Sequence, residues 1–189
     1  MALKYTNPYG DSSFESFNKE NTAFVDKTEF IKIIDELDTK YPVLLRPRRF
    51  GKTTFVQMLL CFYDISFKDK YDEIFKGTKI HEMNLPSHNS YHVIKFDFSG
   101  ISGTNVESLI TNFNQKVSVG INDFLIRYPD FEFSNDYTGR DPANFIDEFF
   151  KTFARYSKSK SLYILIDEYD NFANDVLSND RDLFKTITQ

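Results

Sequence analysis

Residues 46–54, RPRRFGKTT, have the residue types and the spacing of a phosphate-binding loop. They follow a short apolar run at 43–45 and precede a helical pattern, which is the context that such a loop requires. Gly51 lets backbone amides close on phosphate oxygens, and the amino end of the new helix favours an anion. Lys52 can reach the β- and γ-phosphates, and the Thr53 hydroxyl can bind Mg²⁺.

The loop is also strongly basic, and arginine stands at position 46 where the full pattern has its first glycine. The basic run could add charge for a triphosphate, form a solvated loop, or contact nucleic acid. Because the net charge of the chain is −5, the sequence favours ATP over nucleic acid. The predicted nucleotide-binding residues are Arg46, Pro47, Arg48, Arg49, Phe50, Gly51, Lys52, Thr53 and Thr54.

A second group with catalytic potential is Asp167-Glu168, which follows the apolar run LYILI at 162–166. An apolar strand that ends in Asp and Glu is typical of the Walker B element. We expect Asp167 to hold Mg²⁺ and Glu168 to orient or deprotonate the attacking water. Lys52 and Glu168 are therefore the predicted catalytic residues, with Thr53 and Asp167 as Mg²⁺ ligands. A polar turn after a core strand is the alternative, and Asp170 is interpreted as structural.

Periodicity and turn signals predict the elements that position these groups. Strands are expected at 43–45, 91–98 and 162–166, the last buried on both faces. Long helical segments separate them, which indicates a parallel α/β sheet. Residues 64–90 are mixed, 129–140 are a polar loop, and 179–189 look helical.

Helix starts and apolar faces are predicted from cap spacing and from the i, i+3, i+4 pattern. One helix should begin near Asp26, with Glu29 completing the cap, and another at Thr104 with Glu107. Asp141-Pro142 should begin a third. The predicted apolar stripes are Phe30, Ile33, Ile34 and Leu37; Val106, Leu109, Ile110, Phe113, Val117, Ile121 and Phe124; and Phe145, Phe149 and Phe153.

Composition narrows the protein class. The 189 residues include 21 Phe and 11 Tyr, enough large apolar side chains to exclude a disordered tail. A single cysteine, Cys61, excludes an internal disulfide framework and a cysteine-based zinc site, and a reducing cytoplasm is the expected location. The N-terminus has no secretory signal pattern, and no apolar run approaches the 18 or so residues of a membrane span.

Three segments together resemble the predicted AAA-ATPase-like family of microbial proteins: FVDKTEF (24–30), RPRRFGKTT (46–54) and ILIDEYD (164–170). The resemblance implies that arginine is usual at position 46. It also implies that many members carry a C-terminal nuclease-like domain of the PD-(D/E)xK type, although these residues contain no such site. By analogy, FVDKTEF could pack near the adenine; a helix start with a core-facing Phe24 is the equal alternative.

The expected fold is a three-layer P-loop NTPase of the ASCE/AAA-like class with a mostly parallel sheet. The resemblance implies the sheet order 5-1-4-3-2, and we expect the chain to be the N-terminal part of a longer protein. Residues 1–23 should form an N-terminal arm, with Phe14 and Phe17 as anchors, and 24–189 the P-loop ATPase domain.

The expected function is Mg²⁺-dependent ATP hydrolysis that drives a conformational change. The alternatives are a non-hydrolysing nucleotide-gated interaction module and the ATPase part of a nucleic-acid-processing protein. A partner subunit would supply any arginine finger.

Overall fold

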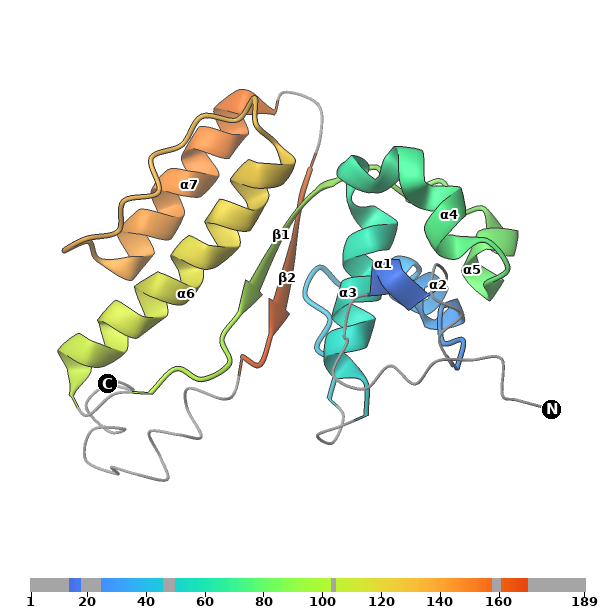
Figure 1. Cartoon of the computed structure of the whole chain (residues 1–189), viewed down its shortest axis with the longest axis horizontal. Helices are drawn as coiled ribbons and strands as arrows, with labels where there is room; N and C mark the ends of the chain where they lie inside the picture. Colours follow the sequence, from blue (N-terminus) through green and yellow to red (C-terminus); the bar gives the residue numbers. More distant parts are fainter. Residues whose placement is uncertain (1–13, 18–24, 46–49, 103–104, 158–160, 170–189) are drawn as a thin grey trace. The chain divides into compact units, whose positions relative to one another are not determined.

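The computed structural model describes residues 14–17, 25–45, 50–102, 105–157 and 161–169. The chain forms two compact units, Met1–Val93 and Ile94–Gln189. In the described residues, the first unit is mainly helical, and the second contains two long helices and a parallel pair of strands (Figure 1).

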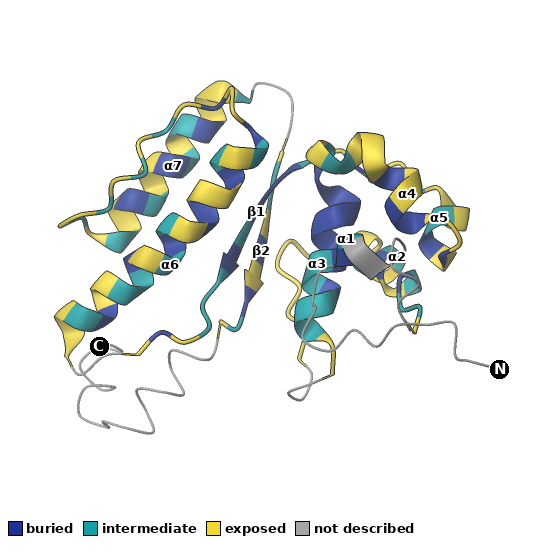
Figure 2. Ribbon diagram, in the orientation of Figure 1, coloured by how far each residue is buried: buried dark blue, intermediate teal, exposed yellow. Residues whose placement is uncertain are grey.

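The core of the first unit is built on α3 (Lys52–Tyr63), which confirms the helix predicted after the phosphate loop. Its residues from Met58 onward are all buried, as the dark blue of α3 in Figure 2 shows. Phe62 is fully buried and has its ring centroid 5.8 Å from that of Phe75 in α4 (Tyr71–Phe75). Phe14, in α1 (Phe14–Phe17), packs on Phe75 at 5.3 Å, so the predicted anchor is buried in this core.

Residues 64–90, for which the sequence predicted no elements, contain three short helices. They are η1 (Ile65–Lys70), a 3₁₀ helix, then α4, and then α5 (Lys79–Met83). The Asp64 side chain accepts a hydrogen bond from the amide of Ser66 at 2.8 Å and so begins η1. Asp64 also forms a parallel bridge with Tyr91, which ties this segment to the residue before β1.

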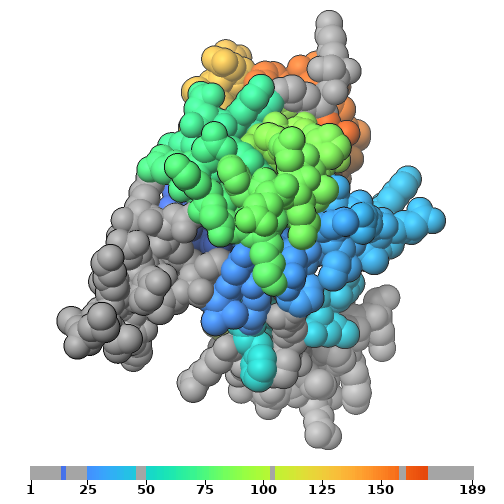
Figure 3. Space-filling model, turned by 90° about the vertical axis from the view of Figure 1, so that its right-hand side faces the viewer, coloured from blue at the N-terminus to red at the C-terminus, as the bar shows by residue number. Residues whose placement is uncertain are grey.

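The first predicted helix is shorter than expected and buries a different side. α2 covers Glu29–Asp35, and its N-cap, Thr28, makes no side-chain cap bond, so the predicted Asp26–Glu29 cap is wrong. Ile31 is the buried residue of α2, whereas Phe30, Ile33 and Leu37 of the predicted stripe are exposed. Figure 3 shows residues 25–45, in blue, on the surface beside the green residues of α5.

The strand predicted at 43–45 is also wrong. These residues have no regular secondary structure, and Val43 and Leu45 are 66% and 78% exposed. A strand is stabilised by the ladder of hydrogen bonds to a neighbour. Among the described residues no strand pairs with 43–45, so their apolar character alone does not order them as a strand.

The strands predicted at 91–98 and 162–166 are confirmed as β1 (His92–Asp97) and β2 (Leu162–Asp167). They are hydrogen-bonded neighbours and run in the same direction (Figure 1). The prediction that the second strand is buried on both faces is wrong. Leu165 and Asp167 are buried, but Ile164 and Ile166, on the opposite face, are 43% and 48% exposed.

Two helices complete the second unit: α6 (Val106–Arg127) and α7 (Pro142–Tyr156). The cap of α6 is Asn105 with Ser108, one residue later than predicted, and Val106 and Ile110 of its predicted stripe are exposed. The cap of α7 is confirmed, because Asp141 accepts from the amide of Asn144 at 3.0 Å and Pro142 is the first helical residue.

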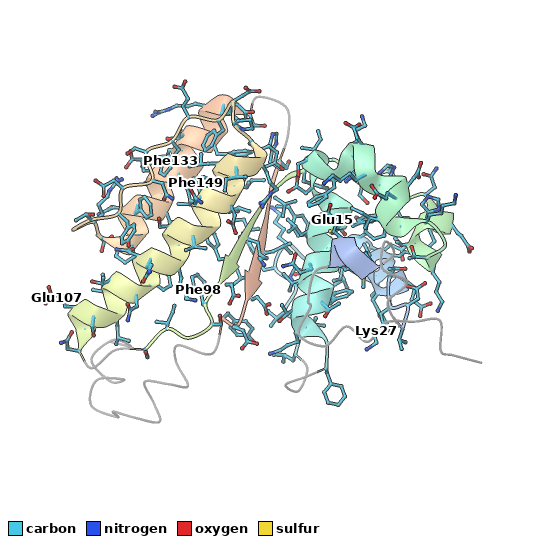
Figure 4. The ribbon with its side chains drawn as sticks, viewed as in Figure 1. Glu15, Lys27, Phe98, Glu107, Phe133 and Phe149 are labelled. Atoms are coloured by element: carbon cyan, nitrogen blue, oxygen red, sulfur yellow. The ribbon has the colours of Figure 1, made fainter. Side chains whose placement is uncertain are left out.

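The predicted apolar face of α7 is confirmed, and it forms an aromatic core with α6. Phe145, Phe149 and Phe153 are all buried. Phe149 has its ring centroid 5.3 Å from that of Phe124 in α6 and 5.3 Å from that of Phe133 in the preceding loop. Figure 4 labels Phe133 and Phe149, which lie close together between the loop and α7.

Candidate functional site

The first candidate segment is the start of α3, in the first unit, and it is centred on Gly51, the N-cap of the helix. Gly51 has φ = +74° and ψ = +29°, in the left-handed region that glycine adopts readily. Its carbonyl accepts the first helical hydrogen bond from the amide of Phe55 at 2.9 Å. No side chain caps Gly51, and the first turn has no acidic residue, so the described part of α3 presents a positive end to an anion.

Three polar residues begin α3 at this end: Lys52, Thr53 and Thr54. Each is partly exposed, and among the described residues no carboxylate pairs with the Lys52 ammonium group. Phe50, directly before Gly51, is 59% exposed. The ammonium, hydroxyl and backbone amide groups at this helix end can all donate hydrogen bonds to the oxygen atoms of a polyphosphate. Arg46, Pro47, Arg48 and Arg49 lie outside the described residues.

The second candidate segment is the end of β2, in the second unit. Asp167 is the last residue of the strand and is only 4% exposed. Its Oδ1 accepts from the amide of Glu168 at 3.0 Å. Glu168 is partly exposed and has φ = +52°, a left-handed conformation that is uncommon for a residue with a side chain. Such strain is concentrated at functional sites. Asp170 lies outside the described residues.

A carboxylate that the sequence analysis did not single out, Asp97, lies beside Asp167. The amide of Phe98 donates to the carbonyl oxygen of Asp167 at 3.1 Å, which pairs the ends of β1 and β2 in register. The sequence does contain the signal, because KFDF at 95–98 and LIDE at 165–168 both place Asp at the end of an apolar strand. Phe98, labelled in Figure 4, stacks on Phe113 of α6 at 4.9 Å and anchors the end of β1.

The polar side chains of FVDKTEF contact the start of α5. Asp26 accepts from the amide of Lys79 at 2.8 Å and from the Thr28 hydroxyl at 2.7 Å, and Thr28 accepts from the amide of Ile80 at 3.1 Å. Lys79 also pairs with Glu29 at 2.7 Å. These bonds satisfy two amides at the amino end of α5 and therefore join α2 to α5. Phe24 lies outside the described residues.

The same contacts set the acidity of Asp26. Partial burial alone would raise the pKa of Asp26, but the hydrogen bonds from the Lys79 amide and from the hydroxyl and amide of Thr28 outweigh it. The pKa of Asp26 is consequently lowered from its ordinary value of 3.8.

Two of the three histidines belong to an aromatic stack in the first unit. Tyr71 stacks on His88 with ring centroids 4.3 Å apart and on His81 at 5.7 Å. The Nε2 of His81 lies 2.9 Å from Asp72 Oδ1. Burial, with a smaller contribution from the Asp72 charge, raises the pKa of the Tyr71 hydroxyl to about 12. Within the described ranges, no three His, Cys, Asp or Glu side chains are grouped as a metal site would need.

The described residues form an α/β protein in which one helix begins at a left-handed glycine and one of two parallel strands ends in Asp167, followed by Glu168. The chain belongs to the family described as predicted AAA-ATPase (AAA-ATPase_like), whose model matches residues 8–189. This membership confirms the resemblance seen in the sequence and indicates a nucleotide-binding role. No curated protein and no solved structure gives a significant match to the chain. Among the described helices, none has the length and hydropathy needed to cross a lipid bilayer.

Proposed function

We propose that the chain binds Mg²⁺·ATP and hydrolyses it, and that hydrolysis drives a conformational change. The observation that carries the proposal is the start of α3. There Gly51 has the left-handed conformation that opens a phosphate loop, and Lys52 makes no ion pair within the described residues. Family membership supports the same nucleotide-binding role independently.

In this proposal the residues of α3 bind the phosphates. The amides that follow Gly51 donate to phosphate oxygens, and the Lys52 ammonium group neutralises charge on the β- and γ-phosphates. Arg46, Arg48 and Arg49 add positive charge to the loop, and Phe50 and Thr54 flank the binding residues. The proposed ligand of this loop is the triphosphate of ATP, because a cation-rich loop at a helix N-terminus complements several adjacent negative charges.

The proposed metal ligands offer a donor set that suits Mg²⁺. The Thr53 hydroxyl and the Asp167 carboxylate are oxygen donors, and Mg²⁺ prefers oxygen ligands. The hydrogen bond from the Glu168 amide to Asp167 Oδ1 holds the carboxylate in one orientation. When bound, Mg²⁺ supplies charge neutralisation at the phosphate oxygens. Glu168 orients the attacking water and accepts its proton.

We infer the larger fold on the same grounds. The proposal places β1 and β2 in a three-layer, mostly parallel sheet of the ASCE/AAA-like class. Their parallel pairing and the packing of α6 on β1 support this architecture. A C-terminal nuclease-like domain and a subunit that supplies an arginine finger are proposed partners, inferred from the family alone.

The test of hydrolysis is phosphate release by the wild-type chain and by Glu168→Gln. If Glu168 is the general base, its amide variant should bind Mg²⁺·ATP with the wild-type affinity but release phosphate about 10²- to 10⁴-fold more slowly. Tyr169→Phe, a change in the next residue that removes no carboxylate, is the control and should keep the wild-type rate. Tight ATP binding with no phosphate release by the wild-type chain would contradict hydrolysis and favour the nucleotide-gated interaction module.

A further inference from the structure

Asp97 and Asp167 end two neighbouring parallel strands at the same level. β1 ends at Asp97, β2 ends at Asp167, and the bond from the Phe98 amide to the Asp167 carbonyl fixes their register. Residues paired in this way have their side chains on the same face of the sheet. The backbones of neighbouring strands lie about 4.8 Å apart, so Asp97 and Asp167 are cross-strand neighbours on one face of the sheet.

One local hydrogen bond orients each carboxylate. Asp97 Oδ1 accepts from the amide of Ser99 at 2.9 Å, and Asp167 Oδ1 accepts from the amide of Glu168 at 3.0 Å. In the described ranges, no hydrogen bond reaches the second oxygen of either carboxylate, and no Lys, Arg or His side chain pairs with them. Within those ranges, each carboxylate has a second oxygen that no hydrogen bond occupies.

The burial of Asp167 makes this arrangement costly without a cation. Asp167 is 4% exposed, so a carboxylate charge at this residue is largely removed from water. Buried charges in proteins are either paired or bound to metal ions. The positive charge that suits two neighbouring carboxylate oxygens is a hard divalent cation.

We propose that Asp97 is a second carboxylate ligand, beside Asp167, of the divalent cation that accompanies the nucleotide. The ligation is direct or through one metal-bound water, since Mg²⁺ retains several waters in protein sites. This inference rests on the proposed function and adds to it a residue on β1. The pairing register of β1 and β2 then matters for metal binding, because a shift of one residue would move Asp97 to the face of the sheet opposite Asp167.

The test is calorimetric titration of the full chain with ATP over a range of Mg²⁺ concentrations and in EDTA. The measured quantity is the Mg²⁺ concentration at which the ATP affinity has risen halfway from its value in EDTA to its value at saturating Mg²⁺. For Asp97→Asn this concentration should be about 10- to 100-fold higher than for the wild type, whereas the ATP affinity in EDTA should be unchanged. Asp97→Glu, which keeps the charge, should lie between this variant and the wild type. Asp130→Asn removes an exposed carboxylate of the same unit and should behave as the wild type.

A second measurement separates metal binding from a purely structural role of Asp97. Thermal unfolding with and without Mn²⁺ should show that Asp97→Asn reduces the gain in Tm on adding the metal, without lowering the Tm in EDTA. A lower Tm under both conditions, with the full metal gain retained, would overturn the proposal in favour of a structural role.

The failure of this inference differs from the failure of the proposed function. A wild-type Mg²⁺ requirement in Asp97→Asn, with a raised requirement in Asp167→Asn, would overturn the role of Asp97 alone. If the wild-type chain bound no ATP with or without Mg²⁺, both proposals would fall.

Discussion

Gly120 of α6 lies against Phe96 of β1 so closely that a Cβ atom on the glycine would stand 2.6 Å from the Phe96 ring. The carbonyl oxygen of Lys95 would lie at the same distance, and this backbone atom cannot rotate away as a side chain can. The missing Cβ therefore lets α6 pack directly on the strand that ends at Asp97.

Gly120→Ala should consequently destabilise the protein. Relieving the overlap requires α6 and β1 to move apart, and overpacking of this kind typically costs about 1–3 kcal/mol. Chemical denaturation should show a lower free energy of unfolding. Val119→Ala changes an exposed residue of the same helix and should alter that free energy by less than about 0.5 kcal/mol. Equal stability of Gly120→Ala and the wild type would show that α6 does not pack this closely.

A comparison of two glycine variants distinguishes the effect of backbone strain from an effect on phosphate binding. Gly51 and Gly77 have φ of +74° and +83°, and a Cβ at either position meets no atom within 4 Å. Alanine at each should therefore cost a similar amount, about 1–2 kcal/mol, through the backbone alone. Only Gly51→Ala should weaken ATP binding, because Gly77 is remote in sequence from the phosphate loop. Equal ATP affinity of the two variants would contradict the role of Gly51.

The contacts of Asp26 predict a pH-dependent contribution to stability. Since the folded-state pKa of Asp26 is below 3.8, its carboxylate stabilises the fold above that pH and loses this effect as the pH falls through the folded value. Asp26→Asn should lower the free energy of unfolding by about 1 kcal/mol at neutral pH. The difference from the wild type should shrink below about pH 3.8. Asp38→Asn, which changes an exposed residue, should show no such difference.

The buried hydroxyl of Tyr71 makes a contrasting prediction. This hydroxyl has no hydrogen-bond partner among the described residues, so Tyr71→Phe should keep or raise the stability at pH 7. The pKa of about 12 means that the unfolded chain loses this proton first. Stability should therefore fall as the pH rises from about 10 to 12. This fall should be smaller in Tyr71→Phe, whereas Tyr41→Phe, at an exposed residue, should retain it.

Where one side of an element meets a continuous core, its sequence predicted its structure well. α7 has three phenylalanines four residues apart, and all three are buried. Its Asp-Pro start is a cap that depends only on adjacent residues. The strand before Asp167 was predicted for a similar reason, because a run of β-branched and other large apolar residues favours a strand whatever lies beside it.

The errors occur where a distant segment decides the outcome. α2 is only seven residues long. Thr28 and Ile31 are fully buried, whereas Phe30 and Ile33 are exposed. Thr28 contacts α5, some fifty residues later in the chain. Neither that contact nor the register that brings Asp97 beside Asp167 can be read from periodicity. At 43–45, three apolar residues satisfy the strand pattern, but a strand also needs a neighbour.

The most direct test of nucleotide binding is calorimetry of Mg²⁺·ATP with the wild-type chain, Lys52→Ala and Lys68→Ala. Lys68 is exposed and lies in η1, so its variant removes one positive charge outside the phosphate loop. A hydrogen bond between charged groups contributes about 1.5–3 kcal/mol, which corresponds to a loss of affinity of about 10- to 100-fold. We predict this loss for Lys52→Ala and the wild-type affinity for Lys68→Ala. Equal affinity of the wild type and Lys52→Ala would contradict the phosphate-loop assignment.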